Sequence, residues 1–204
     1  MIKIVDYGLG NIQAFLNVYK SHNIPASIAK TASELESATR IILPGVGSFD
    51  HAMQLLDESG MRDTLNDFVL SRRIPILGIC VGMQMLARCS EEGTSEGLGW
   101  IPGVVRKLKN NNDHELLRLP HMGWNSVEQV MSHRLFAGLN DNSHFYFLHS
   151  YYFECDNHNS TLAKANYGSH FACVVNNENI FGVQFHPEKS HHSGALLLKN
   201  FAEM

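Results

Sequence analysis

The sequence predicts a doubly wound α/β fold, in which a mixed, mostly parallel sheet carries helices on both faces. Up to Trp100 the chain alternates between short apolar runs and amphipathic segments, which is typical of βα units. After Trp100 it changes to strand-like segments separated by Gly, Asn and Asp clusters, which indicates antiparallel strands. The last segment places apolar residues at helical spacing.

The individual elements follow from these patterns in chain order. We expect strands at 2–5, 26–29, 40–43, 76–79, 145–148 and 181–185, and helices at 11–21, 49–58, 61–70 and 193–203. In the terminal helix, Ala195, Leu196, Leu198 and Phe201 are expected on the buried face. The polar stretch 110–113 is expected to be a loop or hairpin tip. No repeat, linker or low-complexity stretch divides the chain, so residues 1–204 are expected to form one domain.

Composition excludes several classes of function. The 204 residues are 44% hydrophobic, which is typical of a globular protein able to bury a substantial core. A formal net charge of -4 with mixed signs provides no basic face for nucleic acid. The first apolar run, Met1 to Val5, is too short for a signal peptide, and no run has the length of a membrane span. We therefore expect a cytoplasmic protein that binds neither nucleic acid nor membrane.

The histidines and cysteines give no sign of a metal site or a disulfide framework. His191 and His192 are adjacent, but no carboxylate or Cys lies at ligand spacing beside them, which favours a surface pair. The four cysteines include no Cys-x-x-Cys. We therefore expect no metal and no cofactor. A reducing compartment would suit a reactive thiol.

One cysteine lies where a strand is expected to turn sharply into a helix. Cys80 stands in Gly78-Ile79-Cys80-Val81-Gly82, after an apolar run and before the helix-like stretch 83–87. The flanking glycines allow strand and helix to approach closely, and a helix N-terminus favours thiolate over thiol. A buried Cys is more often a small hydrophobic residue. The motif alone is therefore weak evidence for a nucleophile.

A second motif supplies the partners that a thiolate nucleophile needs. The expected strand 181–185 leads into His186-Pro187-Glu188, so a base and a carboxylate that orients it emerge together. Each has an ordinary alternative, because His186 could be a turn residue and Glu188 a solvated carboxylate. Both motifs at the ends of expected strands together predict a hydrolytic enzyme with a catalytic cysteine.

These motifs resemble those of the triad-type class I glutamine amidotransferases, and in particular the glutaminase subunit of imidazole glycerol phosphate synthase. The resembling segments are VDYGLGNI (5–12), LPGVGSF (43–49), PHMGWN (120–125), HSYY (149–152) and GVQFHPEKS (182–190). They occur in the family's order over the whole chain. The resemblance implies the flavodoxin-like, doubly wound fold of that family and a single glutaminase domain over residues 1–204.

The resemblance also implies a reaction and the residues that perform it. Cys80 would attack the side-chain amide of L-glutamine, His186 would transfer the proton to departing ammonia, and Glu188 would orient the imidazole. The backbone amides of Val46 and Val81 would hold the oxyanion. The alternative for the loop at Val46 is a simple tight turn.

The resemblance further implies contacts to the substrate. Gln84 lies one helical turn past Cys80 and would face the substrate, unless it is simply an exposed helical Gln. Glu91 and Glu92 resemble the segment that contacts the α-ammonium group; Glu92 is favoured, although a solvated charged loop is an alternative. Ser150 and Tyr151 resemble the segment whose backbone holds the α-carboxylate, although aromatic residues there are also typical of core.

A glutaminase of this kind implies a partner that uses the ammonia. In the resembled family that partner is a (β/α)8-barrel cyclase subunit, which forms a heterodimer with the glutaminase and makes imidazole glycerol phosphate in histidine biosynthesis. Asn11, Trp124 and Lys189 stand in family motifs without a role in the triad chemistry, so we expect them at the interface. For Trp124 a core position is the alternative, and for Lys189 ordinary exposure.

Two other functions stay open from the sequence. A paralogous glutaminase could supply ammonia for amidination of a cell-surface sugar, with the same chemistry and another acceptor. A glutaminase-like binding module or a different thiol hydrolase is disfavoured, because Cys80, His186 and Glu188 are intact and the segment 120–125 resembles the glutaminase subunit.

Overall fold

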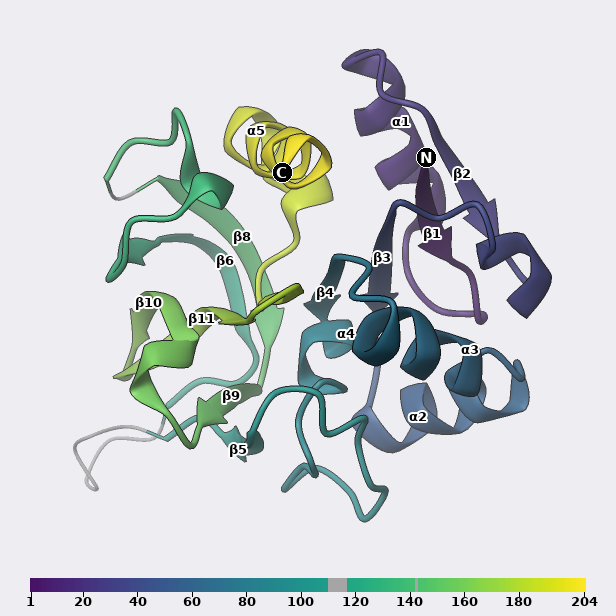
Figure 1. The fold of residues 1–204 in the computed structure, drawn as a ribbon. Coiled ribbons are helices and arrows are strands. Elements are labelled where there is room, and N and C mark those ends of the chain that lie inside the picture. Colours follow the sequence, from purple (N-terminus) through teal and green to yellow (C-terminus); the bar gives the residue numbers. More distant parts are fainter. Residues whose placement is uncertain (110–116, 142) are drawn as a thin grey trace.

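The computed structural model describes residues 1–109, 117–141 and 143–204 (Figure 1). The expected loop at 110–113 lies outside these residues. The strands are β1 (Ile2–Val5), β2 (Ala26–Ala29), β3 (Arg40–Gly45), β4 (Ile76–Cys80), β5 (Gly103–Lys107), β6 (His121–Ser126), β7 (Glu128–Gln129), β8 (His144–His149), β9 (Tyr151–Cys155), β10 (Thr161–Tyr167), β11 (Ser169–Asn177) and β12 (Ile180–Val183). The α-helices are α1 (Ile12–Ser21), α2 (Phe49–Glu58), α3 (Arg62–Asn66), α4 (Val81–Gln84) and α5 (His191–Glu203).

One half of the main sheet is parallel and doubly wound. Its strands follow the order β2-β1-β3-β4-β12, and each neighbouring pair is parallel. Strands β1, β4 and β12 are buried along their whole length, which explains why they are apolar at every position except Lys3. Helices α1 and α5 pack together on one face, and α2 to α4 lie on the other (Figure 1). The predicted fold class is confirmed.

The other half of the sheet is antiparallel, as expected for the region after Trp100. Strands β11, β10 and β7 continue from β12 in that order, and β9 pairs with both β11 and β5. Strands β6 and β8 form a separate antiparallel pair, in which His121 lies opposite His149. This small sheet stands beside β10 and β11 in Figure 1. Ser150 alone separates β8 from β9, so it joins the two sheets.

Three expected helices differ from the observed ones. The helix expected at 61–70 is α3 followed by a π-helical turn at Asp67–Ser71. Of the helix-like stretch 83–87, only Met83 and Gln84 are helical, because α4 begins at Val81 and ends at Gln84. Helix α5 begins two residues earlier than expected and buries Gly194, Leu197, Leu198 and Phe201. Leu198 and Phe201 are buried as expected, whereas Ala195 and Leu196 are only partly buried. Gly194 fits because a side chain there would collide with the Pro187 carbonyl.

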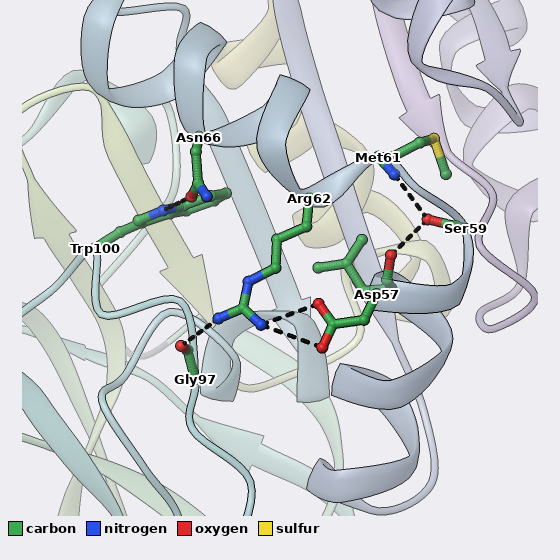
Figure 2. A network of polar contacts seen from close by, with 8 residues as sticks. Asp57, Ser59, Met61, Arg62, Asn66, Gly97 and Trp100 are labelled. Atoms are coloured by element: carbon green, nitrogen blue, oxygen red, sulfur yellow. Dashed lines mark hydrogen bonds and ion pairs between the residues drawn. The ribbon is translucent and has the colours of Figure 1, made fainter.

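Polar contacts tie the α2–α3 connection to the loop that precedes β5 (Figure 2). The Arg62 guanidinium pairs with Asp57 at 2.9 Å and donates to the Gly97 carbonyl at 3.1 Å. The buried Trp100 donates its indole N–H to Asn66 Oδ1 at 2.8 Å. These bonds hold the segment after α4 against the helical layer, and this segment carries Glu92.

Candidate active site

Cys80 lies at a strained turn between β4 and α4. Its φ is +55° and its ψ is −113°, a conformation that residues with a side chain rarely adopt. The turn is possible because glycines surround it: a Cβ at Gly78 would lie 2.5 Å from the Gly82 carbonyl oxygen, and one at Gly82 would lie 2.0 Å from the Leu43 carbonyl oxygen. The expected sharp strand-to-helix turn is confirmed, and it presents Cys80 at the carboxyl edge of the parallel strands.

His186 and Glu188 follow β12, the strand next to β4, and form a buried pair. His186 Nδ1 lies 2.9 Å from Glu188 Oε1, and the two side chains are 4% and 2% exposed. Burial alone would lower the pKa of His186, but its interactions with Cys80 and Glu188 outweigh this effect and raise the pKa to about 10. The arrangement therefore favours a protonated His186 imidazole between Glu188 and Cys80.

A cleft of about 290 Å³ opens above Cys80 at the carboxyl ends of the parallel strands, where ligands of open α/β sheets bind. Most of its lining residues are ones that the sequence singled out. They are Val46, Gly47, Cys80, Val81, Gln84, Glu92, Pro120, Leu148, His149, Ser150, Tyr151, His186 and Lys189. Glu188 is not on the cleft wall, because it lies behind His186 on the far side of the imidazole.

The loop after β3 is packed against the turn at Cys80. A Cβ at Gly45 would lie 2.3 Å from the Gly82 amide nitrogen, so strand and turn touch backbone to backbone. The buried Tyr7 hydroxyl donates to the Pro44 carbonyl at 2.7 Å and fixes the start of the loop. Val46, the next residue after Gly45, is 38% exposed and lines the cleft.

The structure separates the two neighbouring glutamates. Glu92 lines the cleft, and its Oε2 accepts a hydrogen bond from the Phe49 amide at 2.8 Å, so it caps the N-terminus of α2. Glu91 instead pairs with Arg106 at 3.0 Å and does not line the cleft. The favoured residue, Glu92, is therefore the one that can reach a ligand.

Gln84 is buried, so the alternative of an exposed helical Gln is wrong. Its Nε2 donates to the Tyr151 carbonyl and to Gln184 Oε1, both at 3.1 Å. Gln184 in turn places its own Nε2 3.8 Å from Cys80 Sγ. The amide of Gln84 thus supports the wall that contains Ser150 and Tyr151.

Four residues near the cleft were given no role by sequence reasoning, although three of them stand in the quoted family segments. Pro120, Leu148 and His149 line it, and Gln184 lies beneath Cys80. Leu148 contributes its carbonyl, 3.8 Å from Cys80 Sγ. A polar residue inside an otherwise apolar strand end, as in Val183-Gln184-Phe185, was the available signal for Gln184.

The residues expected at an interface are exposed. Trp124 is 48% exposed and stacks on His191 with ring centroids 5.1 Å apart, so the core alternative is wrong. Lys189 lines the cleft and holds its ammonium 5.8 Å from the ring centroid of Tyr146. Asn11 is exposed just before α1. Their contact with a partner stays a prediction.

Three further properties concern the described residues. Within 1–109, 117–141 and 143–204, no group of three or more His, Cys, Asp or Glu side chains could hold a metal ion. No helix in this part of the chain combines the length and apolar character needed to cross a membrane. All four cysteines are free, and burial raises the pKa of Cys155 to about 11 and raises that of Cys173 further.

Comparison with known proteins assigns the family. The family described as "Glutamine amidotransferase class-I" matches residues 2–204. The chain belongs to the class I glutamine amidotransferase family. A relative in Bdellovibrio bacteriovorus named "Imidazole glycerol phosphate synthase subunit HisH" is 60% identical over 204 residues, and one of the same name in Leptospira interrogans is 55% identical; both alignments cover 100% of each chain.

Solved structures support the same fold for this class I glutamine amidotransferase. A structure described as a glutamine amidotransferase matches with a TM-score of 0.75 at 20% identity and covers 99% of this chain and 97% of the other. A chain of PurLQS from Thermotoga maritima matches with a TM-score of 0.71 at 16% identity and covers 99% and 97%. At these identities the likeness concerns the fold alone.

Proposed function

We propose that this chain hydrolyses L-glutamine to L-glutamate and ammonia through Cys80, His186 and Glu188. The observation that supports this most strongly is the buried His186–Glu188 pair, whose imidazole lines the same cleft as Cys80, in a chain of the class I family. The thiolate attacks the side-chain amide carbon, and the imidazolium gives its proton to departing ammonia. Water then attacks the thioester, His186 takes its proton, and glutamate leaves as the thiol re-forms.

The oxyanion of each tetrahedral intermediate would be held by two backbone amides, those of Val46 and Val81. Val81 supports this proposal because it is the first residue of α4, where amides have no partner within the helix. Val46 also lines the cleft, on the loop that packs against the turn through Gly45. Loss of one such donor typically costs about 10²- to 10³-fold in kcat.

The substrate's α-ammonium group would pair with Glu92, and its α-carboxylate would bind the backbone of Ser150 and Tyr151. This orientation is supported by the position of all three residues on the cleft wall, with one carboxylate among them. Gln84 would act on this site through its hydrogen bond to the Tyr151 carbonyl.

We further propose that the chain is the glutaminase subunit of imidazole glycerol phosphate synthase and serves histidine biosynthesis. Relatives at 60% and 55% identity carry that name over their full length. The partner would be a (β/α)8-barrel cyclase that forms a heterodimer through Asn11, Trp124 and Lys189. Residues 1–204 would act as one glutaminase domain, and the free Cys80 thiol suits the reducing cytoplasm.

Glutamine hydrolysis by the purified chain tests this proposal, with Cys80→Ala as the blank. The assay is run alone and with a candidate cyclase subunit plus its nucleotide ligand. Activity that depends on Cys80 and rises with the cyclase supports both parts. Activity without stimulation would contradict the cyclase as partner and favour another acceptor enzyme. No hydrolysis under any condition, with Cys80 shown to be reactive by thiol labelling, would contradict the glutaminase assignment.

A further inference from the structure

Two buried histidines, one in the cleft wall and one behind it, have no part in the chemistry proposed above. His121 on β6 and His149 at the end of β8 lie opposite each other in the small sheet and are 4% and 5% exposed. His149 lines the cleft, and Ser150 and Tyr151 follow it directly. Buried histidines need hydrogen-bond partners for both ring nitrogens, and these partners can be traced.

A chain of four contacts runs from the cleft wall through both rings. His149 Nδ1 lies 2.8 Å from the Tyr151 carbonyl oxygen, and His149 Nε2 lies 3.3 Å from His121 Nδ1. His121 Nε2 lies 3.3 Å from Asn125 Nδ2, which also donates to the Asn166 carbonyl at 2.9 Å. The chain therefore has a carbonyl acceptor at one end and an amide donor at the other.

These two ends fix the protons on both rings. A carbonyl oxygen only accepts, so His149 carries its proton on Nδ1 and leaves Nε2 as an acceptor. His121 must then donate from Nδ1, which leaves its Nε2 to accept from Asn125. The orientation of the Asn125 amide is set independently, because its Oδ1 accepts from the Ser126 amide at 2.9 Å. Both histidines are thus neutral Nδ1–H tautomers.

Aromatic rings hold the two imidazoles in place. His121 is stacked between Phe147 and Tyr167, with centroids 4.9 Å and 4.1 Å away. The His149 ring meets Phe171 edge-on at 5.1 Å. Burial lowers the pKa of His149 to about 3 and that of His121 to about 4, in agreement with two neutral rings.

The chain of contacts ends on the backbone that would bind substrate. The Tyr151 carbonyl accepts from His149 and also from Gln84 Nε2, and the Ser150 carbonyl accepts from the Leu108 amide at 2.9 Å. In a trans peptide the N–H points away from the C=O, so fixing the Ser150 carbonyl also fixes the direction of the Tyr151 amide. Both peptide planes at Tyr151 are therefore held from behind the cleft.

We propose that His149, kept in one tautomer by His121, is a positioning residue that orients the Ser150–Tyr151 backbone for the α-carboxylate of glutamine. This role rests on the glutaminase function proposed above. Neither histidine exchanges a proton with the substrate. Their effect is on binding of the ground state and the transition state alike, so the loss of the contact changes KM more than kcat.

Kinetics of matched variants in the complex with the cyclase test the role. His149→Phe removes the donor to Tyr151 while keeping an aromatic ring, and it is expected to raise KM for glutamine about 10-fold with kcat within about twofold. His149→Asn keeps an N–H near the position of Nδ1 and is expected to restore most of the affinity. An unchanged KM in His149→Phe, or a fall in kcat alone, would overturn the proposal.

A spectroscopic test on the unsubstituted chain separates this inference from the proposed function. Nitrogen-15 NMR of the imidazoles distinguishes Nδ1–H from Nε2–H tautomers and both from imidazolium. Two neutral Nδ1–H rings at pH 7 are expected for His121 and His149. An Nε2–H tautomer or a charged ring at His149 would overturn the inference, whether or not the chain hydrolyses glutamine. If the spectrum is as expected but the chain does not hydrolyse glutamine, the tautomers of His121 and His149 stand, and the role of His149 in binding glutamine is overturned.

Discussion

Gly45 sets the distance between β3 and the turn that carries Cys80. In Gly45→Ala the new Cβ would lie 2.3 Å from the Gly82 nitrogen and 2.8 Å from the Val81 carbonyl carbon. Ordinary contacts begin at 3.4 Å, so the backbone has to separate by roughly 1 Å in a closely packed interior. The obstructing atoms belong to the main chain, and therefore no rotamer change relieves the collision.

Both stability and catalysis should respond to this separation. Overpacking of this kind typically costs about 1–3 kcal/mol of the free energy of unfolding. A displacement of about 1 Å at a catalytic group can lower the rate by about 10²-fold. We therefore expect Gly45→Ala to fold with reduced stability and to lose about 10²-fold in kcat, because Val46 and Val81 no longer face the same point.

Urea unfolding and glutamine hydrolysis in the complex with the cyclase measure the two effects. Gly60→Ala is the control: its φ of +69° makes a side chain unfavourable, but no atom lies within 4 Å of the new Cβ. It should lose about 1–2 kcal/mol of stability from backbone strain and keep its kcat. A Gly45→Ala variant that matches this control in both measurements would refute the view that close backbone packing positions the site.

Three other outcomes are expected. Glu92→Gln should raise KM for glutamine about 10-fold or more in steady-state assays, because a charge-assisted bond is lost, whereas Glu91→Gln should leave KM unchanged. Trp124→Ala should weaken binding of the cyclase by about 2 kcal/mol in calorimetry, with stability within about 0.5 kcal/mol, because the side chain is exposed. The third outcome concerns pH, because His121 and His149 stay neutral in the folded chain but titrate near pH 6.5 in the unfolded chain. Their contribution to the free energy of unfolding is therefore complete above pH 6.5. In urea unfolding, that free energy should fall by up to about 2.7 kcal/mol per pH unit as the pH drops toward 4.

The parts of the site that follow from the sequence are those encoded by neighbouring residues. Cys80 lies between glycines after an apolar run, and His186 and Glu188 are two residues apart. The local sequence pattern was therefore sufficient to identify all three as catalytic candidates. Their strands, β4 and β12, are adjacent and parallel, and this places both motifs at one edge of the sheet. The doubly wound fold was predictable for the same reason, because βα alternation is a local signal.

The parts that the sequence left open depend on contacts between distant segments. Which of Glu91 and Glu92 lines the cleft depends on contacts with distant segments: Glu92 is bonded to the Phe49 amide at the start of α2, whereas Glu91 pairs with Arg106. The importance of His149 depends on the β6–β8 register, which places it opposite His121. Two-residue strand periodicity gives the face on which a side chain lies, but it does not identify the partner across the sheet.

The strain at Cys80 shows how fold and chemistry are connected in this chain. A non-glycine residue at a positive φ costs about 1–3 kcal/mol and persists only if its surroundings determine it completely. Here the surroundings are β3, β4 and β12, which pack side by side with almost no exposed surface, and the glycines that let α4 sit directly on them. The substrate side of the cleft is built differently, because Ser150 joins two sheets. There the Ser150 carbonyl accepts a hydrogen bond from the Leu108 amide, and the Tyr151 carbonyl accepts from His149 and Gln84. Packing therefore positions the nucleophile, whereas hydrogen bonds position the proposed carboxylate site, so substitutions at Gly45 and at His149 should separate loss of kcat from loss of substrate affinity.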